Sequence, residues 1–206
     1  MKSILALTIA SLAFASPVPE PAAAARAAGP PSFKIKNVVS GGSGCPQGSI
    51  DINYTDSTVM PIYFSRDFTA SVGPSVAAAE SRKNCQINID LLYSAGWSYA
   101  VYSADYSGWA DIDDGVKGIV KSTYYFSGST DQCSSVMKLN GPTTGWYKKH
   151  DDVAISVWSP CSGEAMLNVN TEVALTPLGG AGSGTIVAVK EQARFTNSLY
   201  IKWRQC

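Results

Sequence analysis

The chain has 206 residues, of which 45% are hydrophobic and 16% are charged. This length and composition predict one globular domain, or two at most, and exclude a wholly disordered chain. The 16 basic residues balance the 16 acidic ones, so we expect no basic surface that would attract nucleic acid or an anionic membrane. With so few charges, the surface must be carried by Ser, Thr, Asn, Gly and Tyr, as in many extracellular β proteins.

Residues 1–15 are predicted to form a secretory signal peptide. Lys2 supplies the positive start, residues 4–10 form the apolar run, and Ala13 and Ala15 provide a small-x-small cleavage pattern. The apolar run is well short of the ~20 residues that a membrane span needs. We therefore expect a secreted, extracellular protein without a membrane span.

Residues 16–32 are rich in proline and alanine and show no hydrophobic period. Five prolines in this segment confine any helix to a turn or two. We interpret the segment as a disordered spacer or a short pro-segment. A single folded domain is therefore predicted over residues 33–206.

Alternation of hydrophobic and polar residues dominates the folded region. It is clearest where Ile87, Ile89 and Leu91 alternate with polar residues, and it recurs over 167–175. Such alternation indicates strands with one buried face and one solvated face. In chain order, the predicted strands are 33–39, 50–54, 59–64, 85–91, 97–104, 116–126, 153–157, 167–175, 186–189 and 199–203.

About ten short strands separated by glycine-rich breaks predict an all-β fold, an antiparallel β-sandwich or a flattened barrel. The one helical candidate is a turn or two over 76–82, after Pro74. Six side chains are predicted to be buried: Ile87, Ile89, Leu91, Val169, Val173 and Ile201. Four polar neighbours are predicted to be more solvated: Gln86, Asn88, Asn168 and Asn170.

The five cysteines are expected to be oxidised in an exported chain. Choosing the odd cysteine in five ways and pairing the other four in three ways leaves 15 patterns that the sequence cannot separate. Cys45, Cys85, Cys161 and Cys206 lie at the ends of strand-like runs, whereas Cys133 lies in a polar segment predicted to be a turn. We predict that Cys133 is free, and the simplest pairing is Cys45–Cys85 and Cys161–Cys206. With one histidine and no C-x-x-C, a zinc site is disfavoured.

His150 is the chain's one histidine and is followed by two aspartates. A histidine beside a carboxylate could serve acid–base chemistry. A hydrolytic triad also needs a positioned Ser or Cys, and the chain has no G-x-S-x-G elbow. The simpler interpretation places His150 in a solvated loop before the strand at 153.

The densest acidic cluster is Asp111, Asp113 and Asp114, followed by Gly115. Clustered carboxylates in a glycine-containing loop suit calcium, but the spacing differs from that of a calcium loop and no Glu follows at the right distance. A polar turn between strands is the simpler interpretation. No other pair of carboxylates stands out as one that could hydrolyse a glycoside. We therefore predict no catalytic residue, no metal and no cofactor.

Aromatic residues form 10% of the chain and crowd its middle. A sugar-binding sandwich uses exposed aromatics beside Asn and Gln rows to stack on pyranose faces, but aromatics also fill sandwich cores. The best candidate for an exposed binding patch is the segment 97–109. Its aromatic residues are Trp97, Tyr99, Tyr102, Tyr106 and Trp109.

Asn53 begins the sequon Asn53-Tyr54-Thr55 and is the predicted glycosylation site. It falls on the polar side of the alternation formed by Ile50, Ile52 and Tyr54, where a glycan has room.

Several short blocks carry a family resemblance. They are GSGCPQGS at 42–49, SRKNCQ at 81–86, STYYFSG at 122–128, VWSPC at 157–161, LNVN at 167–170 and KWRQC at 202–206. In these blocks the chain resembles the small secreted proteins, mostly of filamentous fungi, catalogued as domain of unknown function 4360. Cys133 lies outside the blocks, unlike the other four cysteines. The resemblance implies a secreted fungal β domain and brings no established activity or catalytic residue.

Three kinds of function remain open. The first is a secreted protein that acts by binding a host or cell-wall component, as an effector, elicitor or wall-associated factor. The second is a carbohydrate-binding module, and the third is a hydrolase that uses His150 or an acidic pair. The lack of an activated nucleophile motif and of a metal-ligand set favours binding by a monomer over catalysis. A flat, exposed aromatic row would favour the second, and a cleft with convergent carboxylates the third.

Overall fold

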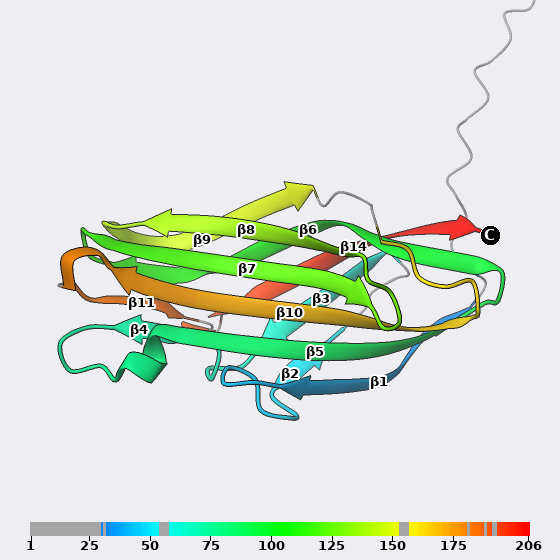
Figure 1. Ribbon diagram of the computed structural model, residues 1–206, viewed down its shortest axis with the longest axis horizontal. Helices are drawn as coiled ribbons and strands as arrows, with labels where there is room; N and C mark the ends of the chain where they lie inside the picture. The colour runs from blue at the N-terminus through cyan, green and yellow to red at the C-terminus, as the bar shows by residue number, and fades with distance from the viewer. Residues whose placement is uncertain are drawn as a thin grey trace, which may run out of the picture.

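Two antiparallel β-sheets stacked face to face form the protein (Figure 1). The computed structural model describes residues 30, 32–53, 58–152, 157–180, 182–187, 189–190 and 193–206. The predicted signal peptide, most of the predicted spacer and positions 153–156 of a predicted strand lie outside these residues. In the described part of the chain, no helix is long and apolar enough to cross a membrane.

The first sheet has five strands in the order β1-β5-β10-β7-β8. Their bounds are β1 Phe33–Gly41, β5 Arg82–Tyr93, β7 Val116–Phe126, β8 Gln132–Asn140 and β10 Glu164–Pro177. In Figure 1 this sheet lies in front. Its central strands are the ones whose period-2 alternation is strongest in the sequence.

The second sheet has seven strands, in the order β2-β3-β14-β6-β11-β4, with β9 paired to the remaining edge of β6. Their bounds are β2 Ile50–Ile52, β3 Val59–Phe64, β4 Ala70–Val72, β6 Trp97–Ile112, β9 Thr143–Asp152, β11 Gly184–Val187 and β14 Thr196–Gln205. A two-stranded ribbon, β12 Val189–Lys190 and β13 Ala193–Arg194, and two short 3-10 turns, Ala78–Ser81 and Leu178–Gly180, complete the described elements.

The core lies between the two sheets and confirms the predicted sandwich. Inward-facing residues alternate with outward-facing ones along each long strand, as period 2 requires. All six side chains predicted to be buried are at most 3% exposed.

Three local predictions were wrong. The polar segment expected to be a turn around Cys133 is strand β8, and His150, expected in a solvated loop before residue 153, lies on strand β9. Asn168, predicted to be more solvated, is only 3% exposed: the Asn88 amide donates to its carbonyl oxygen, and its own amide donates to Ser127 Oγ at 2.9 Å. The helical candidate over 76–82, predicted to be a turn or two, is a single 3-10 turn, Ala78–Ser81.

Strand β9 was missed because both of its faces carry polar residues. Its sheet position explains this: β8 and β9 are edge strands, one in each sheet, and their side chains meet at the rim of the sandwich. Lys149 Nζ donates to the carbonyl oxygen of Val136 at 2.8 Å, and Ser135 Oγ donates to Asp151. Side-chain hydrogen bonds therefore connect the two sheets at this edge.

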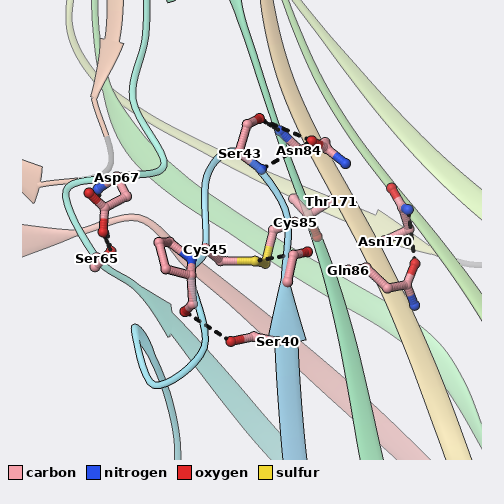
Figure 2. The surroundings of a disulfide bond; sticks show 12 residues. Ser40, Ser43, Cys45, Ser65, Asp67, Asn84, Cys85, Gln86, Asn170 and Thr171 are labelled. Atoms are coloured by element: carbon pink, nitrogen blue, oxygen red, sulfur yellow. Dashed lines mark hydrogen bonds between the residues drawn. A yellow bond between two sulfur atoms is a disulfide. The ribbon is translucent and has the colours of Figure 1, made fainter.

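Two disulfides each cross-link segments that are far apart in the sequence. Cys45, after β1, is bonded to Cys85 on β5, with Cα atoms 5.3 Å apart, and Figure 2 shows Ser43 and Asn84 hydrogen-bonded beside them. The second disulfide, Cys161–Cys206, joins the segment before β10 to the last residue, with Cα atoms 6.2 Å apart. The fifth cysteine, on β8, is free and partly buried.

A buried polar network connects the two sheets inside the core. Tyr106 on β6 and Tyr124 on β7 bring their hydroxyl oxygens to 2.5 Å. Asn197 on β14 donates to Ser122 Oγ on β7 at 3.2 Å, and Ser122 in turn contacts Thr171 Oγ1 on β10 at 3.0 Å. These side chains can hydrogen-bond to one another only when the two sheets are aligned in this way. The network therefore favours one alignment of the two sheets.

Candidate functional site

The outer face of the seven-stranded sheet carries a continuous row of paired side chains along β6 and β9. Residues directly opposite each other on antiparallel strands point to the same face. The outward pairs, which we call the β6–β9 ladder, are Asp111–Thr144, Trp109–Trp146, Ser107–Lys148, Asp105–His150 and Ser103–Asp152. At about 6.8 Å for every second residue, the ladder runs for roughly 27 Å.

The tryptophan pair, Trp109 and Trp146, is the apolar part of this ladder. Trp146 is 58% exposed, the highest value among the exposed large hydrophobic side chains of the described residues. Trp109 lies directly opposite on β6 and is partly exposed. The two adjacent indoles form an apolar surface within an otherwise polar row, and apolar surface with a polar rim is a feature of binding sites.

Asp105 organises the middle of the ladder. Its side chain is only 15% exposed, and its carboxylate accepts hydrogen bonds from His150 Nδ1 at 2.5 Å and Tyr200 Oη at 2.9 Å. Lys148 Nζ lies 3.6 Å from the same carboxylate. Burial alone would raise the pKa of Asp105, but the hydrogen bonds from His150 and Tyr200 outweigh it and lower that pKa.

Ser103, His150 and Asp105 lie in the order of a serine-hydrolase triad, with His150 Nε2 3.0 Å from Ser103 Oγ. A second acceptor for the serine proton distinguishes this row from a triad. Ser103 Oγ lies 3.1 Å from the carbonyl oxygen of Asp151, and when it donates its proton there, His150 Nε2 must donate to Ser103 Oγ. Both ring nitrogens can donate only in the imidazolium form. The hydrogen bond that His150 donates to Asp105 raises the pKa of His150, against its desolvation.

Ser103 is also poorly placed as a nucleophile. It is 1% exposed and lies in mid-strand, paired with Tyr200 on one edge and with Asp152 on the other. Its backbone amide therefore faces a neighbouring strand, where it cannot stabilise an oxyanion. The arrangement is suited to donating and accepting charge-assisted hydrogen bonds at the surface.

The structure divides the five aromatics of the predicted patch. Tyr99 and Tyr106 are buried, so the prediction that they contribute to an exposed patch was wrong. Their positions alternate inward, where Tyr99 packs against Phe126 with ring centroids 5.0 Å apart. Trp97 packs partly against the core. Tyr102 and Trp109 remain at the surface.

Tyr102 owes its exposure to a β-bulge. The pairing of β6 with β14 shifts register there, so Tyr102 lies opposite no residue of β14 and turns outward at 38% exposure. Its ring centroid lies 6.2 Å from that of Tyr200.

Sequence reasoning did not identify Trp146, Lys148, Asp105 or Tyr200 as site residues. Trp146 and Lys148 lie four and two residues before His150, so an extended strand would place all three side chains on one face, but no hydrophobic period over 143–152 indicated a strand there. Asp105 and Tyr200 are 95 residues apart, and no local pattern indicates that they meet.

An open cavity of about 440 Å³ lies at the tryptophan end of the ladder, where Asp111, Asp113 and Thr185 line it opposite Val72 and Pro74. Asp111 accepts a hydrogen bond from Thr144 at 2.7 Å, and Asp113 accepts one from the Ser183 amide at 2.9 Å. In the described ranges, no group of three or more His, Cys, Asp or Glu side chains could hold a metal ion. Asp113 and Asp114 of the acidic cluster lie in the turn between β6 and β7, as the simpler interpretation expected, whereas Asp111 lies on β6.

The rows of Asn and Gln lie on the opposite side of the molecule, on the outer face of the five-stranded sheet. There Asn170 donates to Gln86 at 2.9 Å and Asn88 donates to Asn168. The amides therefore bond largely to one another, and the exposed indoles are on the other sheet. Asn53 is exposed just after β2, but the rest of its sequon lies outside the described residues, so glycosylation stays a prediction.

Comparison with known proteins identifies relatives of the chain. A family model described as a domain of unknown function, DUF4360, matches residues 31–206. An uncharacterized secreted protein of Arthroderma benhamiae is 38% identical over 180 residues, which cover 86% of this chain and 73% of the relative. The secreted relative and the two disulfides agree with the extracellular location expected from the sequence.

Two solved structures show weak likeness. TmCBM61 in complex with β-1,4-galactotriose has a TM-score of 0.29 and 11% identity, over 84% of this chain and 91% of that one. The MgGH51 α-L-arabinofuranosidase has a TM-score of 0.26 and 10% identity, over 76% of this chain and 23% of that one. Such TM-scores carry no functional argument. On the family model and the secreted relative, the chain is a secreted member of the family catalogued as domain of unknown function 4360.

Proposed function

We propose that the protein acts outside the cell by binding a carbohydrate along the β6–β9 ladder. The observation that carries this proposal is the tryptophan pair. A pyranose ring presents an apolar C–H face that stacks on an indole, and Trp146 offers such a face at 58% exposure. Trp109, directly opposite, widens the contact surface.

The polar rungs that follow the tryptophan pair along β9 suit the hydroxyl groups of a sugar. Lys148 is a donor with 71% of its side chain exposed, and Asp152 is an acceptor with 92% exposed. Charged donors and acceptors make stronger hydrogen bonds to hydroxyls than neutral ones. A sugar can therefore stack on the indoles and bond to the neighbouring rungs at the same time.

The same pattern argues against a protein partner at this face. The centres of protein interfaces are depleted of Lys, Glu and Asp, whereas here Lys148 stands next to the tryptophan pair in the same row. An effector, elicitor or wall-associated role is compatible with glycan binding and would follow from the glycan bound.

The test is retention of the purified mature protein by insoluble β-1,3-glucan, cellulose and chitin. We expect the wild-type protein to be retained by at least one of these and the Trp146→Ala variant to be released. The matched control is Met166→Ala, which shortens a side chain that is 40% exposed on the outer face of the other sheet. Equal retention of Trp146→Ala and wild type, or no retention by any polysaccharide, would contradict the proposal.

A further inference from the structure

A second cluster of exposed rings lies farther along the ladder from the tryptophan pair. We call Tyr102, His150 and Tyr200 the tyrosine–histidine cluster. The ring centroids of His150 and Tyr200 are 6.0 Å apart at an interplanar angle of 65°, and those of Tyr102 and Tyr200 are 6.2 Å apart at 57°. The His150 side chain is 57% exposed, so the cluster offers ring surface to a ligand.

From these two ring surfaces we infer that the ligand is an extended, neutral polysaccharide chain that lies along β9 and contacts both. The inference rests on the proposed function and adds the shape and charge of the ligand. The distance between the two ring surfaces, their rigidity and the charges between them support this inference.

The distance follows from the strand geometry. Trp146 and His150 are four residues apart on β9 and point to the same face, which separates them by about 13 Å. That separation exceeds the width of one sugar ring, so a monosaccharide reaches one surface and leaves the other empty. Between them, the Ser107–Lys148 rung supplies a hydroxyl and an ammonium group for the sugar units that bridge the gap.

Rigidity comes from Asp105. Its carboxylate accepts hydrogen bonds from His150 Nδ1 at 2.5 Å and from Tyr200 Oη at 2.9 Å. These bonds orient two rings that lie on two different strands. Side chains that are already ordered lose little entropy when a ligand binds. Asp105 is therefore a positioning residue: it is mostly buried itself and acts through the two rings it orients.

The charges along this part of the ladder nearly cancel. Two acidic groups, Asp105 and Asp152, face two basic groups, Lys148 and His150. A polyanionic chain would gain attraction at one pair and meet repulsion at the other. A neutral chain can form hydrogen bonds with the exposed side chains of Lys148, His150 and Asp152 without that conflict.

A chain-length series measures the contribution of the second surface. Oligosaccharides of β-1,3-glucan, cellulose and chitin, from the disaccharide to the octasaccharide, are titrated into wild-type protein by calorimetry. We expect affinity to rise by at least about tenfold once the chain spans both surfaces, because the second contact becomes intramolecular. A galacturonic acid oligomer of matched length is expected to bind more weakly than the neutral one.

Two variants test whether the tyrosine–histidine cluster causes the rise in affinity with chain length. Tyr200→Ala and Asp105→Asn should lower the affinity for the octasaccharide toward the affinity that the wild-type protein has for the disaccharide. Tyr125→Ala, on the outer face of the five-stranded sheet, is the control, and circular dichroism checks that each variant folds. If affinity is the same at all lengths, or the galacturonic acid oligomer binds best, the inference is wrong and the proposed function survives. Failure to bind any oligosaccharide or polysaccharide would overturn both.

Discussion

Gly108 and Tyr147 lie directly opposite each other on β6 and β9, and the tyrosine occupies the space that a side chain at position 108 would need. A Cβ atom on Gly108 would lie 2.4 Å from Tyr147 Oη and 2.7 Å from Cζ. Tyr147 is thereby packed inward over the glycine, against the core. Because side chains alternate along a strand, its neighbours Trp146 and Lys148 must then point outward into the ladder.

Gly108→Ala should therefore both destabilise the protein and disturb the β6–β9 ladder. Overpacking of this kind costs about 1–3 kcal/mol, which corresponds to a fall in Tm of roughly 2–12 °C for a domain of this size. Thermal unfolding measures it. Gly41→Ala is the control, because a Cβ atom there meets nothing within 4 Å. An unchanged Tm for Gly108→Ala would contradict the packing described.

Asn197 should be far more costly to replace than its polar character suggests. It is fully buried and donates to Ser122 Oγ at 3.2 Å and to Tyr124 Oη at 3.3 Å. Asn197→Ala removes both of these buried hydrogen bonds, at about 0.5–1.5 kcal/mol for each, while Ser122 and Tyr124 keep their bonds to Thr171 and Tyr106. Urea unfolding of this variant beside Asn140→Ala, at an exposed position, compares the two costs. Similar midpoints for both variants would mean that the network does not join the sheets.

Peptide mapping without reduction should recover the pairs Cys45–Cys85 and Cys161–Cys206 and a single thiol at Cys133. These disulfides close loops of 40 and 45 residues, and each stabilises the fold by up to about 4 kcal/mol on the chain-entropy account. Cys133→Ser should lower the stability by much less than the double change Cys45→Ala with Cys85→Ala. A bridge that contains Cys133 would contradict this assignment.

The ion pair of His150 with Asp105 should stabilise the fold in mildly acidic solution. Asp105 raises the pKa of His150 above 6.5, so this contribution is complete below that pH and is lost as pH rises through the folded-state pKa. The pKa of Asp105 is lowered from 3.8, so its contribution is present above that pH and is lost in stronger acid. The Tm difference between wild type and His150→Gln should be largest near pH 5 and shrink by about pH 8. A difference that grows with pH would contradict the pairing.

The sequence predicted the sandwich because β5 and β10 are central strands, and burial of one face imposes strict alternation on residues such as Ile87, Ile89 and Val169. It did not predict β9, an edge strand whose inward side carries Lys149 and Asp151. These two residues are held by hydrogen bonds to β8, not by apolar packing. A hydrophobic period therefore cannot detect this strand.

The candidate site was only partly visible for a related reason. Trp109 belonged to the predicted patch, but its partner Trp146 lay in a segment for which no strand was predicted. The contact between Asp105 and Tyr200 depends on the pairing of β6 with β14, which is fixed by the fold and not by local sequence. His150 was recognised as a candidate, but Asp105 and Ser103, which contact its two nitrogens, lie 45 and 47 residues away on β6, where no local pattern indicates the contact.

The measurement that tests the central claim most directly is a ¹H–¹⁵N NMR titration of the mature protein with the hexasaccharides of β-1,3-glucan, cellulose and chitin. The indole N–H signals of Trp109 and Trp146 and the backbone amides of β6 and β9 should shift with at least one hexasaccharide. Shifts confined to the five-stranded sheet, around Asn88 and Asn168, or no shift with any of the three, would contradict carbohydrate binding along the β6–β9 ladder.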